Sequence, residues 1–335
     1  MGFHVGIVGA GLIGNKRADA IAALGMDKVV AIADIDIEKA KALAAKHKCS
    51  AVADSQELLG DKDVDLVVVA LVIKNLAPIS LAALKNGKHV LCEKPLGINI
   101  RESDTIVEQV KKAGLILKTG FNHRHHPAVA KAKHLADRGE IGRIMFLRCR
   151  YGHGGRPGYE KEWRANKDLC GGGELLDQGV HVADLFRWFA GDFVEAFGYT
   201  ETCFWNMPVE DNAFAMFKTA SGIVATMHTS WTQWKNIFSL EVFGDLGYLV
   251  IDGLGGSYGP ETLKFGRRNP KGGAPEERIE QFTGNDVSWQ LEWTEFTQAI
   301  IEKRQPIGSG FDGWQANKMI DAVQKSAKTK KAVNI

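Results

Sequence analysis

Short apolar runs and longer amphipathic stretches alternate along the first 120 residues of the chain. The apolar runs are continuous, which is typical of parallel strands whose two faces are both covered. They include Phe3–Val8, Lys28–Asp34, Asp65–Leu71, Lys88–Cys92 and Leu115–Gly120. Helical patterns separate them, for example over Ala77–Asn86 and Asn99–Gly114. The pattern predicts six strands separated by helices, an α/β doubly wound parallel sheet.

The pattern changes after residue 122. A helix over Ala128–Asp137 is followed by segments with a period of two, which predict a mostly antiparallel sheet: Ile144–Tyr151, Val194–Phe204, Ala213–Thr219 and Ile223–Trp231. One face of this sheet is partly polar, so it is either solvated or paired with another subunit. Two final helices have apolar stripes that indicate core positions.

The length of 335 residues favours two domains. We place a nucleotide-binding domain at residues 1–122 and a substrate-binding and oligomerisation domain at residues 123–335, whose final helix is able to pack back on the first domain. The second domain is expected to be α+β, built on the mostly antiparallel sheet.

The composition points to small-molecule chemistry. Forty-two basic residues nearly balance 40 acidic ones, and a net charge of +2 gives no general attraction to nucleic acid or membrane. Five scattered cysteines form neither a disulfide framework nor a zinc site. With no stretch long enough to span a bilayer, we expect a cytoplasmic protein. Adjacent histidines at His123–His126 point to opposite faces of an extended segment, so we predict no metal.

The first apolar run leads directly into "GAGLIG", which contains Gly9, Gly11 and Gly14. In this spacing the first glycine permits a tight turn, the second lets the backbone approach a pyrophosphate, and the third lets the helix pack on the strand. Asp34 ends the second run about 20 residues further on, where a carboxylate binds an adenosine ribose. Since Asp34 repels a 2′-phosphate and Ile35 supplies no cation, NAD is favoured over NADP. Capping of the next helix is the alternative role for Asp34.

A lysine follows another strand of the same sheet. Lys94 comes directly after Lys88–Cys92 in "CEKPLG", and Pro95 fixes the turn. Ligands of doubly wound sheets bind at the carboxyl ends of the strands, so Lys94 is expected at the edge of the cofactor site. The expected cofactor-binding residues are Gly9, Gly11, Leu12, Ile13, Gly14, Asp34, Ile35, Leu71, Glu93 and Lys94.

The stretch "GGGELLDQGVHVADLF" predicts a helix that carries Asp177, His181 and Asp184 among core-type residues. We interpret Gly171–Gly173 as a hinge that lets the helix begin close to a ligand, with Asp177 and His181 one turn apart. An imidazole suits removal of a hydroxyl proton near neutral pH, and a carboxylate one turn away can fix its tautomer. The structural alternatives are a buried His181 bound to a carbonyl, Asp177 as a cap, and Asp184 paired with Arg187.

Together, the glycine motif, "EKP" at Glu93–Pro95 and the Gly-Gly-Gly, Asp177, His181 helix resemble the glucose-fructose oxidoreductase, inositol dehydrogenase and MocA (Gfo/Idh/MocA) family. The resemblance covers nearly the whole chain. It implies a Rossmann domain, a second domain whose large sheet assembles homodimers or homotetramers, and NAD(P)-dependent oxidation or reduction of a sugar or cyclitol hydroxyl. It also implies a catalytic set of Lys94, Asp177 and His181. Where the family often has Thr-Pro-Asn, this chain has Leu71-Val72-Ile73.

We expect hydride transfer between a secondary carbinol and nicotinamide, with His181 exchanging the hydroxyl proton, Asp177 orienting it and Lys94 hydrogen-bonding the reacting oxygen. Guanidinium groups at Arg124, Arg156 and Arg164 favour an acidic sugar or nucleotide sugar. Two alternatives share the fold: NAD-dependent glycoside hydrolysis and a non-catalytic NAD sensor. The expected substrate-binding residues are Asn122, Arg124, His126, Lys161, Trp163, Arg164, Asp177 and His181.

Overall fold

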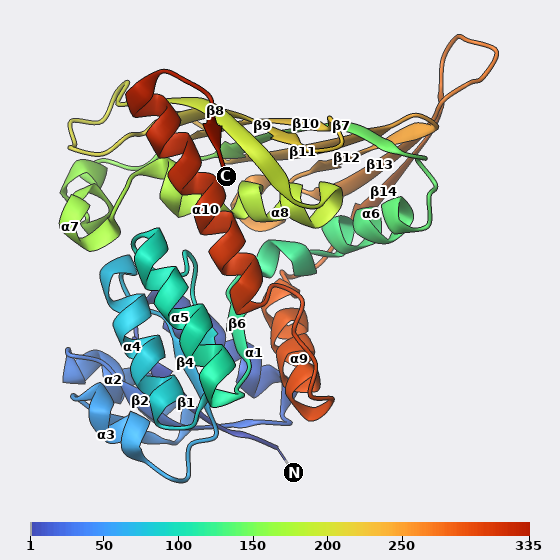
Figure 1. The fold of residues 1–335 in the computed structure, drawn as a ribbon. Coiled ribbons are helices and arrows are strands. Elements are labelled where there is room, and N and C mark those ends of the chain that lie inside the picture. The colour runs from blue at the N-terminus through green and yellow to red at the C-terminus, as the bar shows by residue number, and fades with distance from the viewer. Residues whose placement is uncertain (1) are drawn as a thin grey trace. The chain divides into compact units, whose positions relative to one another are not determined.

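A computed structural model describes residues 2–335, and the chain divides into two units that are treated separately below (Figure 1). The first unit contains residues 2–122 and 289–314, and the second contains residues 123–288 and 315–335. The division after Asn122 lies where the hydrophobic pattern changes. The return of residues 289–314 to the first unit was not part of the expected division.

The sheet of the first unit is entirely parallel, with the strand order β3-β2-β1-β4-β5-β6. This confirms the predicted doubly wound fold. The order reverses between β1 and β4, and this is the point beyond which such sheets bind ligands. The strands are β1 (His4–Val8), β2 (Lys28–Ala33), β3 (Ser50–Val52), β4 (Leu66–Val69), β5 (His89–Cys92) and β6 (Leu117–Thr119).

The helices of the first unit connect these strands, and one comes from far along the chain. They are α1 (Leu12–Leu24), α2 (Ile37–His47), α3 (Ser55–Gly60), α4 (Ile73–Lys85), α5 (Ile100–Ala113) and α9 (Ser288–Ile301). Trp293 and Phe296 of α9 are almost fully buried in one core cluster with Val5 and Ile7 of β1. The apolar stripe of α9 therefore completes the core of the first unit, as Figure 1 shows by its orange colour among blue elements.

The second unit is built on a nine-stranded sheet with the order β14-β13-β12-β11-β7-β10-β9-β8-β15. The sheet is antiparallel except between β7 and β10. Its strands are β7 (Ile144–Gly152), β8 (Phe193–Glu201), β9 (Asn212–Thr219), β10 (Val224–Ser230), β11 (Ile237–Gly244), β12 (Gly247–Asp252), β13 (Glu261–Arg267), β14 (Glu276–Phe282) and β15 (Val333–Asn334). The mostly antiparallel second sheet is thus confirmed.

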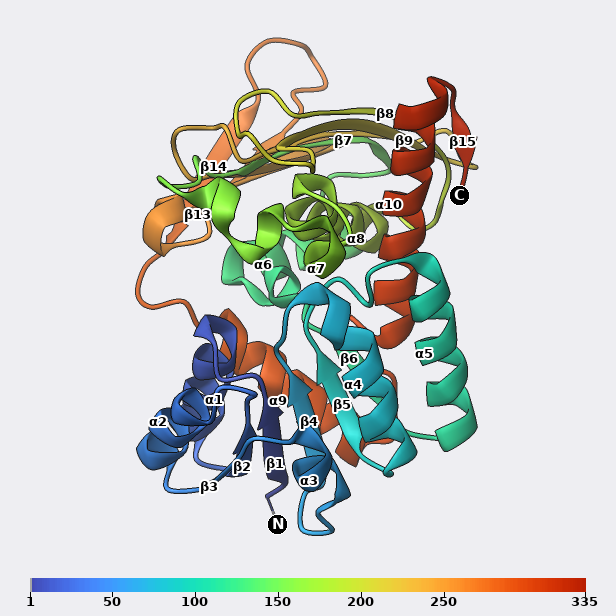
Figure 2. The ribbon, with the colours of Figure 1, turned by 90° about the vertical axis from the view of Figure 1, so that its left-hand side faces the viewer.

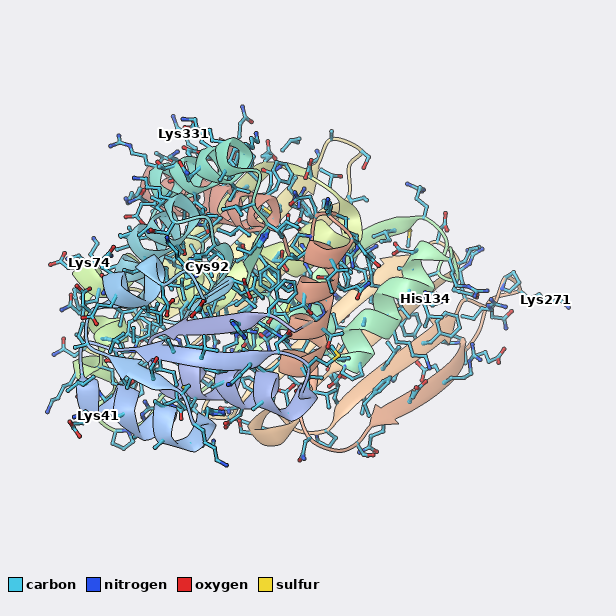
Figure 3. All side chains as sticks on the ribbon, turned by 90° about the horizontal axis from the view of Figure 1, so that it is seen from below. Lys41, Lys74, Cys92, His134, Lys271 and Lys331 are labelled. Atoms are coloured by element: carbon cyan, nitrogen blue, oxygen red, sulfur yellow. The ribbon has the colours of Figure 1, made fainter. Side chains whose placement is uncertain are left out.

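Helices cover one face of this sheet: α6 (Pro127–Asp137), α7 (Lys167–Cys170) and α8 (Val180–Ala190) lie on the same side in Figure 2. The last helix, α10 (Gly310–Thr329), runs from the first unit into the second. The long hairpin between β13 and β14 ends near Lys271, which projects from the sheet in Figure 3. Within residues 2–335, no helix is both long enough and apolar enough to cross a membrane.

A buried charge network ties three elements of the first unit together. Arg17 of α1 is 1% exposed, and its Nε donates to Oε1 of Glu93 at 2.7 Å. Its Nη1 lies 2.5 Å from Oε2 of Glu292 on α9. Burial lowers the pKa of Arg17, but the two carboxylates outweigh it and the net shift is upward. Lys118 of β6 adds a second cation 3.6 Å from Glu292.

Replacing Arg17 with methionine leaves Glu93 and Glu292 buried without their main counter-charge. Loss of one partner from a buried ion pair costs about 3–5 kcal/mol. We therefore expect Arg17→Met to lower the free energy of unfolding in urea by that amount. The matched control is Arg143→Met, because Arg143 is 77% exposed and lies 3.8 Å from Asp245 at the surface. That change should cost less than about 1 kcal/mol; equal losses in the two variants would contradict the assignment.

Candidate active site

The three glycines after β1 each fill the structural role that their spacing predicts. Gly9 has a φ of +107°, and a Cβ there would lie 2.2 Å from the carbonyl oxygen of Ala70. A Cβ on Gly14 would lie 1.8 Å from the carbonyl oxygen of Gly9, so the first turn of α1 packs directly on the loop. A Cβ on Gly11, by contrast, would meet nothing within 4 Å. The loop is closed on the protein side and open beside Gly11, as a dinucleotide pyrophosphate requires.

Asp34 lies at the edge of this loop and is fixed by it. The backbone N–H of Ala10 donates to its Oδ2 at 2.7 Å, and that of Asp36 donates to its Oδ1 at 2.9 Å. Asp36, not Asp34, is the residue before α2. Two apolar side chains are highly exposed: Leu12, which follows Gly11, at 75%, and Ile35, which follows Asp34, at 96%. A rigid carboxylate and exposed apolar groups beside an open glycine loop fit the adenosine half of a dinucleotide.

The carboxyl end of β5 places two neighbouring charged residues in different environments. Glu93 is buried and paired with Arg17, so its carboxylate supports α1. Lys94 is half-buried and follows Cys92 by two residues; Cys92, labelled in Figure 3, is fully buried at the end of the strand. Leu71, after β4, is half-buried, and its Cδ2 lies 3.1 Å from where a Cβ on Gly9 would be. The Glu93 side chain is thus committed to Arg17 in the interior, whereas the next residue, Lys94, is partly exposed.

The segment before α8 is not the continuous α-helix that the sequence suggested. Residues Leu175–Gly179 form a π-helical turn, and α8 begins only at Val180. Asp177 lies in the π turn and His181 in the α-helix, so the interval between them spans a change of helical geometry. Single π turns inside helices occur frequently at functional sites.

The glycines before this turn do not form the predicted hinge. Gly171 has a φ of +74° and ends α7. A Cβ on Gly173 would lie 1.9 Å from the carbonyl oxygen of Glu210, and Gly173 N–H donates to the Glu210 carboxylate at 3.0 Å. Close backbone packing and a helix end, rather than ligand access, therefore explain these two glycines.

Arg164 holds the carboxylate of Asp177. Arg164 Nε donates to Oδ2 of Asp177 at 3.1 Å, and both side chains are largely buried. Burial lowers the pKa of Arg164, but the combined effect of Asp177, Tyr159 and Glu162 outweighs it and the net shift is upward. Trp163 stacks against this guanidinium, with 4.4 Å between the carbon of the guanidinium and the ring centre. Of the predicted substrate ligands, Trp163 and Arg164 therefore gather around Asp177.

His181 is 5% exposed and lies against a second histidine. Its ring stacks on that of His123, with ring centres 3.8 Å apart and planes 26° apart. Nε2 of His123 is 3.0 Å from the hydroxyl of Tyr151, at the end of β7. Neither His123 nor Tyr151 was among the predicted site residues: in "HRHH" only Arg124 and His126 were assigned to the substrate, and Tyr151 has the pattern of an ordinary strand residue.

The structure gives Arg124 and Asp184 a different role from the predicted ones. Arg124 donates from Nε to Oδ2 of Asp184 at 2.8 Å and from its second nitrogen to Oδ1 at 2.6 Å. Both residues are buried, and Arg187 forms an ion pair with Asp192 at 2.6 Å. The sequence-based alternative of an Asp184–Arg187 pair stays a prediction. We assign Arg124 to anchoring α8 and not to the substrate.

The remaining predicted substrate ligands lie in three surroundings. His126 is buried, with Nδ1 3.2 Å from Oε2 of Glu261. Asn122 is also buried, at the end of the first unit. Lys161 lines a surface hollow of about 390 Å³ with Glu160, Lys167 and Asp168. Over residues 2–335, no group of three or more His, Cys, Asp or Glu side chains is arranged to hold a metal ion.

Comparison with known families covers both units. Residues 3–121 match the oxidoreductase family with an NAD-binding Rossmann fold, and residues 129–250 match the GFO/IDH/MocA C-terminal domain. Each match begins and ends within one of the two units described above.

The relatives extend the likeness over the full length. Levoglucosan dehydrogenase of Pseudarthrobacter phenanthrenivorans is 27% identical over 99% of this chain and 98% of its own. The 1,5-anhydro-D-fructose reductase of Ensifer adhaerens is 30% identical over 98% of each chain. A solved structure of levoglucosan dehydrogenase with NADH and L-sorbose has a TM-score of 0.92 at 25% identity, covering 100% of this chain and 99% of that one. The chain thus belongs to the Gfo/Idh/MocA family and is an NAD-binding oxidoreductase.

Proposed function

We propose that the protein is an NAD-dependent dehydrogenase that oxidises or reduces a secondary hydroxyl of a sugar or cyclitol. The observation on which this depends is the position of Lys94 at the carboxyl end of β5, in the same sheet whose first strand opens on the glycine loop. Ligand chemistry in doubly wound sheets takes place beyond these strand ends. Bound NAD supplies the hydride acceptor, and NADH the donor in the reverse direction.

In this proposal three side chains transfer the hydroxyl proton and stabilise the charge that develops on the oxygen. His181 accepts the proton as the carbinol becomes a carbonyl, and returns it in the reverse reaction. Lys94 hydrogen-bonds the oxygen and stabilises the negative charge that develops there. Asp177, fixed by Arg164, orients His181 and stabilises its charged form.

We propose a neutral sugar or cyclitol, and this revises the expected preference for acidic substrates. Each of the three arginines that suggested an acidic group lies beside a carboxylate: Arg124 beside Asp184, Arg156 beside Glu162 and Arg164 beside Asp177. A guanidinium already paired in this way has little net charge to attract a second anion. The names of several relatives, among them a myo-inositol 2-dehydrogenase of Thermotoga maritima, support neutral substrates, although one relative is named for a dTDP-linked sugar.

We also propose that NAD is preferred to NADP. The Asp34 carboxylate is held at the loop edge by two backbone N–H groups, and the residue after it is the exposed Ile35. A 2′-phosphate at this position would face a fixed negative charge with no cation from the neighbouring residue.

We propose a homodimer or homotetramer assembled through the sheet face opposite α6 and α8. Large apolar side chains on β8 and β9 are exposed there: Val194 (44%), Tyr199 (45%), Phe214 (43%) and Met216 (50%). Tyr199 and Phe214 are cross-strand partners, and Met216 lies two residues from Phe214 on the same face of β9. Apolar patches of this kind mark interaction surfaces.

The glycine loop is tested by placing a methyl group at two of its positions. Gly11→Ala should leave the melting temperature unchanged, since a Cβ there meets no atom within 4 Å, yet weaken NADH binding by about 10-fold or more because the methyl occupies ligand space. Gly14→Ala should lower the melting temperature as well, owing to the 1.8 Å clash. Thermal unfolding and NADH fluorescence titration measure both effects. Undiminished NADH binding by Gly11→Ala would refute the assigned cofactor position.

The reaction is tested by following reduced nicotinamide with levoglucosan, 1,5-anhydro-D-fructose, myo-inositol, a uronic acid and a nucleotide sugar. We expect net NADH formation or consumption with a neutral compound. On that substrate, His181→Asn should lower kcat by about 10²–10⁴-fold, which is typical for loss of a general base.

NADH affinity serves as the control for this variant and should stay unchanged, because His181 lies outside the unit that contains the glycine loop. If His181→Asn kept the native turnover, the assignment of His181 as the base would be refuted. A preference for the uronic acid or the nucleotide sugar would refute the neutral-substrate proposal.

Assembly is tested by Met216→Glu, which places a charge in the centre of the proposed interface. Light scattering coupled to gel filtration should show a smaller particle than the native protein. The matched control is Ile279→Glu on β14, where the side chain is 66% exposed but lies at the far edge of the sheet. If both variants kept the native mass, the interface would lie elsewhere.

A further inference from the structure

His123 and Tyr151 have no role in the proposed reaction, although both are buried beside its base. The His123 ring stacks on His181 at 3.8 Å, and its Nε2 lies 3.0 Å from the Tyr151 hydroxyl. At this distance, a positive charge on one imidazole disfavours protonation of the other.

The contacts of Tyr151 continue into a chain of hydrogen bonds. The hydroxyls of Tyr151 and Tyr258 hydrogen-bond to each other, and Nε2 of Gln178 donates to the Tyr258 hydroxyl at 3.4 Å. Gln178 lies in the π turn, directly after Asp177. The chain therefore begins in the turn before α8 and ends on the ring that stacks on His181.

The amide end occupies one acceptor position in this chain. An amide nitrogen only donates, so Gln178 takes one of the two acceptor positions of the Tyr258 hydroxyl, and the Tyr258 proton can point to Tyr151. A Tyr151 hydroxyl that accepts from Tyr258 has its own proton to donate to Nε2 of His123. An imidazole that accepts at Nε2 is neutral and carries its proton on Nδ1.

Burial keeps both phenols able to donate. It raises the pKa of Tyr151 well above its ordinary value and that of Tyr258 to about 12, so neither hydroxyl ionises near neutral pH. Both hydroxyls therefore keep their protons wherever the enzyme is expected to work.

Two stacked imidazoles hold only one positive charge between them. Like charges a few ångströms apart in a buried site repel strongly, so protonation of either ring suppresses that of the other. A proton on His123 would thus compete with the proton that the proposed base must accept.

We propose that His123 is a positioning residue whose neutral form, fixed by the Gln178–Tyr258–Tyr151 chain, reserves the one proton of the stacked pair for His181. This inference rests on the proposed function of His181 as the base. Tyr151 and Tyr258 act through His123.

Other titratable and charged groups also face this pair from the surrounding elements of the second unit. The carboxylates of Glu174 and Asp177 act on Tyr151, and the ring of His126 lies 5.8 Å from that of His123. Their charges are offset in part by Arg164 on Asp177, while Glu261 lies against His126. None of these groups is altered by the substitutions below, so they form a constant background.

The direct test is the imidazole nitrogen NMR spectrum of the full-length protein, which needs no turnover. In the native protein His123 should stay in the neutral Nδ1–H form from about pH 5 to pH 8, the range in which histidines ordinarily titrate. In Tyr151→Phe, which removes only the hydroxyl, His123 should titrate. Titration of His123 in the native protein, or its failure to titrate in Tyr151→Phe, would overturn the inference.

The functional test is the pH profile of kcat/KM for the oxidation. In Tyr151→Phe we expect kcat to fall about 3- to 10-fold with an unchanged KM, and the acid limb to move to higher pH by roughly half a unit, because either ring now takes the proton. Adding His123→Phe keeps an aromatic stack without a titratable nitrogen and should return the acid limb to its native midpoint. A merely structural role would leave that midpoint unmoved in both variants.

Tyr248→Phe provides the matched control, since Tyr248 donates to the exposed Glu277 far from this chain in sequence and should leave the pH profile unchanged. The NMR result also separates the two proposals. If His181→Asn retained turnover while His123 behaved as expected, the proposed base would be wrong but the stacked-pair assignment would stand.

Discussion

The buried guanidinium of Arg17 is the constraint on which the nucleotide-binding unit depends. It lies on the helix that starts at the glycine loop, contacts the residue before Lys94, and reaches Glu292 on a helix from the end of the chain. The charge is tolerated because two carboxylates surround it, and its geometry fixes α1 relative to the end of β5. The loop for the dinucleotide and the lysine at the strand end are therefore held by one shared contact.

The second unit applies the same rule with different partners. Arg124 and Asp184 anchor α8 from within, Arg164 fixes Asp177, and His126 meets Glu261. In the first two of these contacts, each buried charge has an opposite charge beside it, as the cost of burial requires. As a result, the helix that presents His181 has its orientation set by ion pairs, and the imidazole itself is left for contacts with other rings.

The sequence predicted the parts of this protein that depend on local pattern. The strand runs, the three glycine roles at Gly9, Gly11 and Gly14, and the position of Lys94 after β5 all follow from hydrophobicity and turn chemistry. The π turn at Leu175–Gly179 was not predictable, because a single π turn inside a helix leaves no signal in the hydrophobic pattern. Nor was the partner of Arg124, since ion pairs between residues 60 positions apart leave no periodic signal.

The discontinuous first unit has a consequence for synthesis of the protein. Arg17 leaves the ribosome 275 residues before Glu292, and Trp293 and Phe296, which complete its core, follow with it. Until then the nascent nucleotide-binding unit lacks the apolar side chains of α9 that cover its core and the Glu292 carboxylate that pairs with Arg17. The intervening unit has all but its last residues, 315–335, before that moment. Completion of the cofactor site is thus delayed until Glu292, Trp293 and Phe296 have been synthesised, so a chain stalled in the second unit presents an exposed apolar surface that chaperones bind.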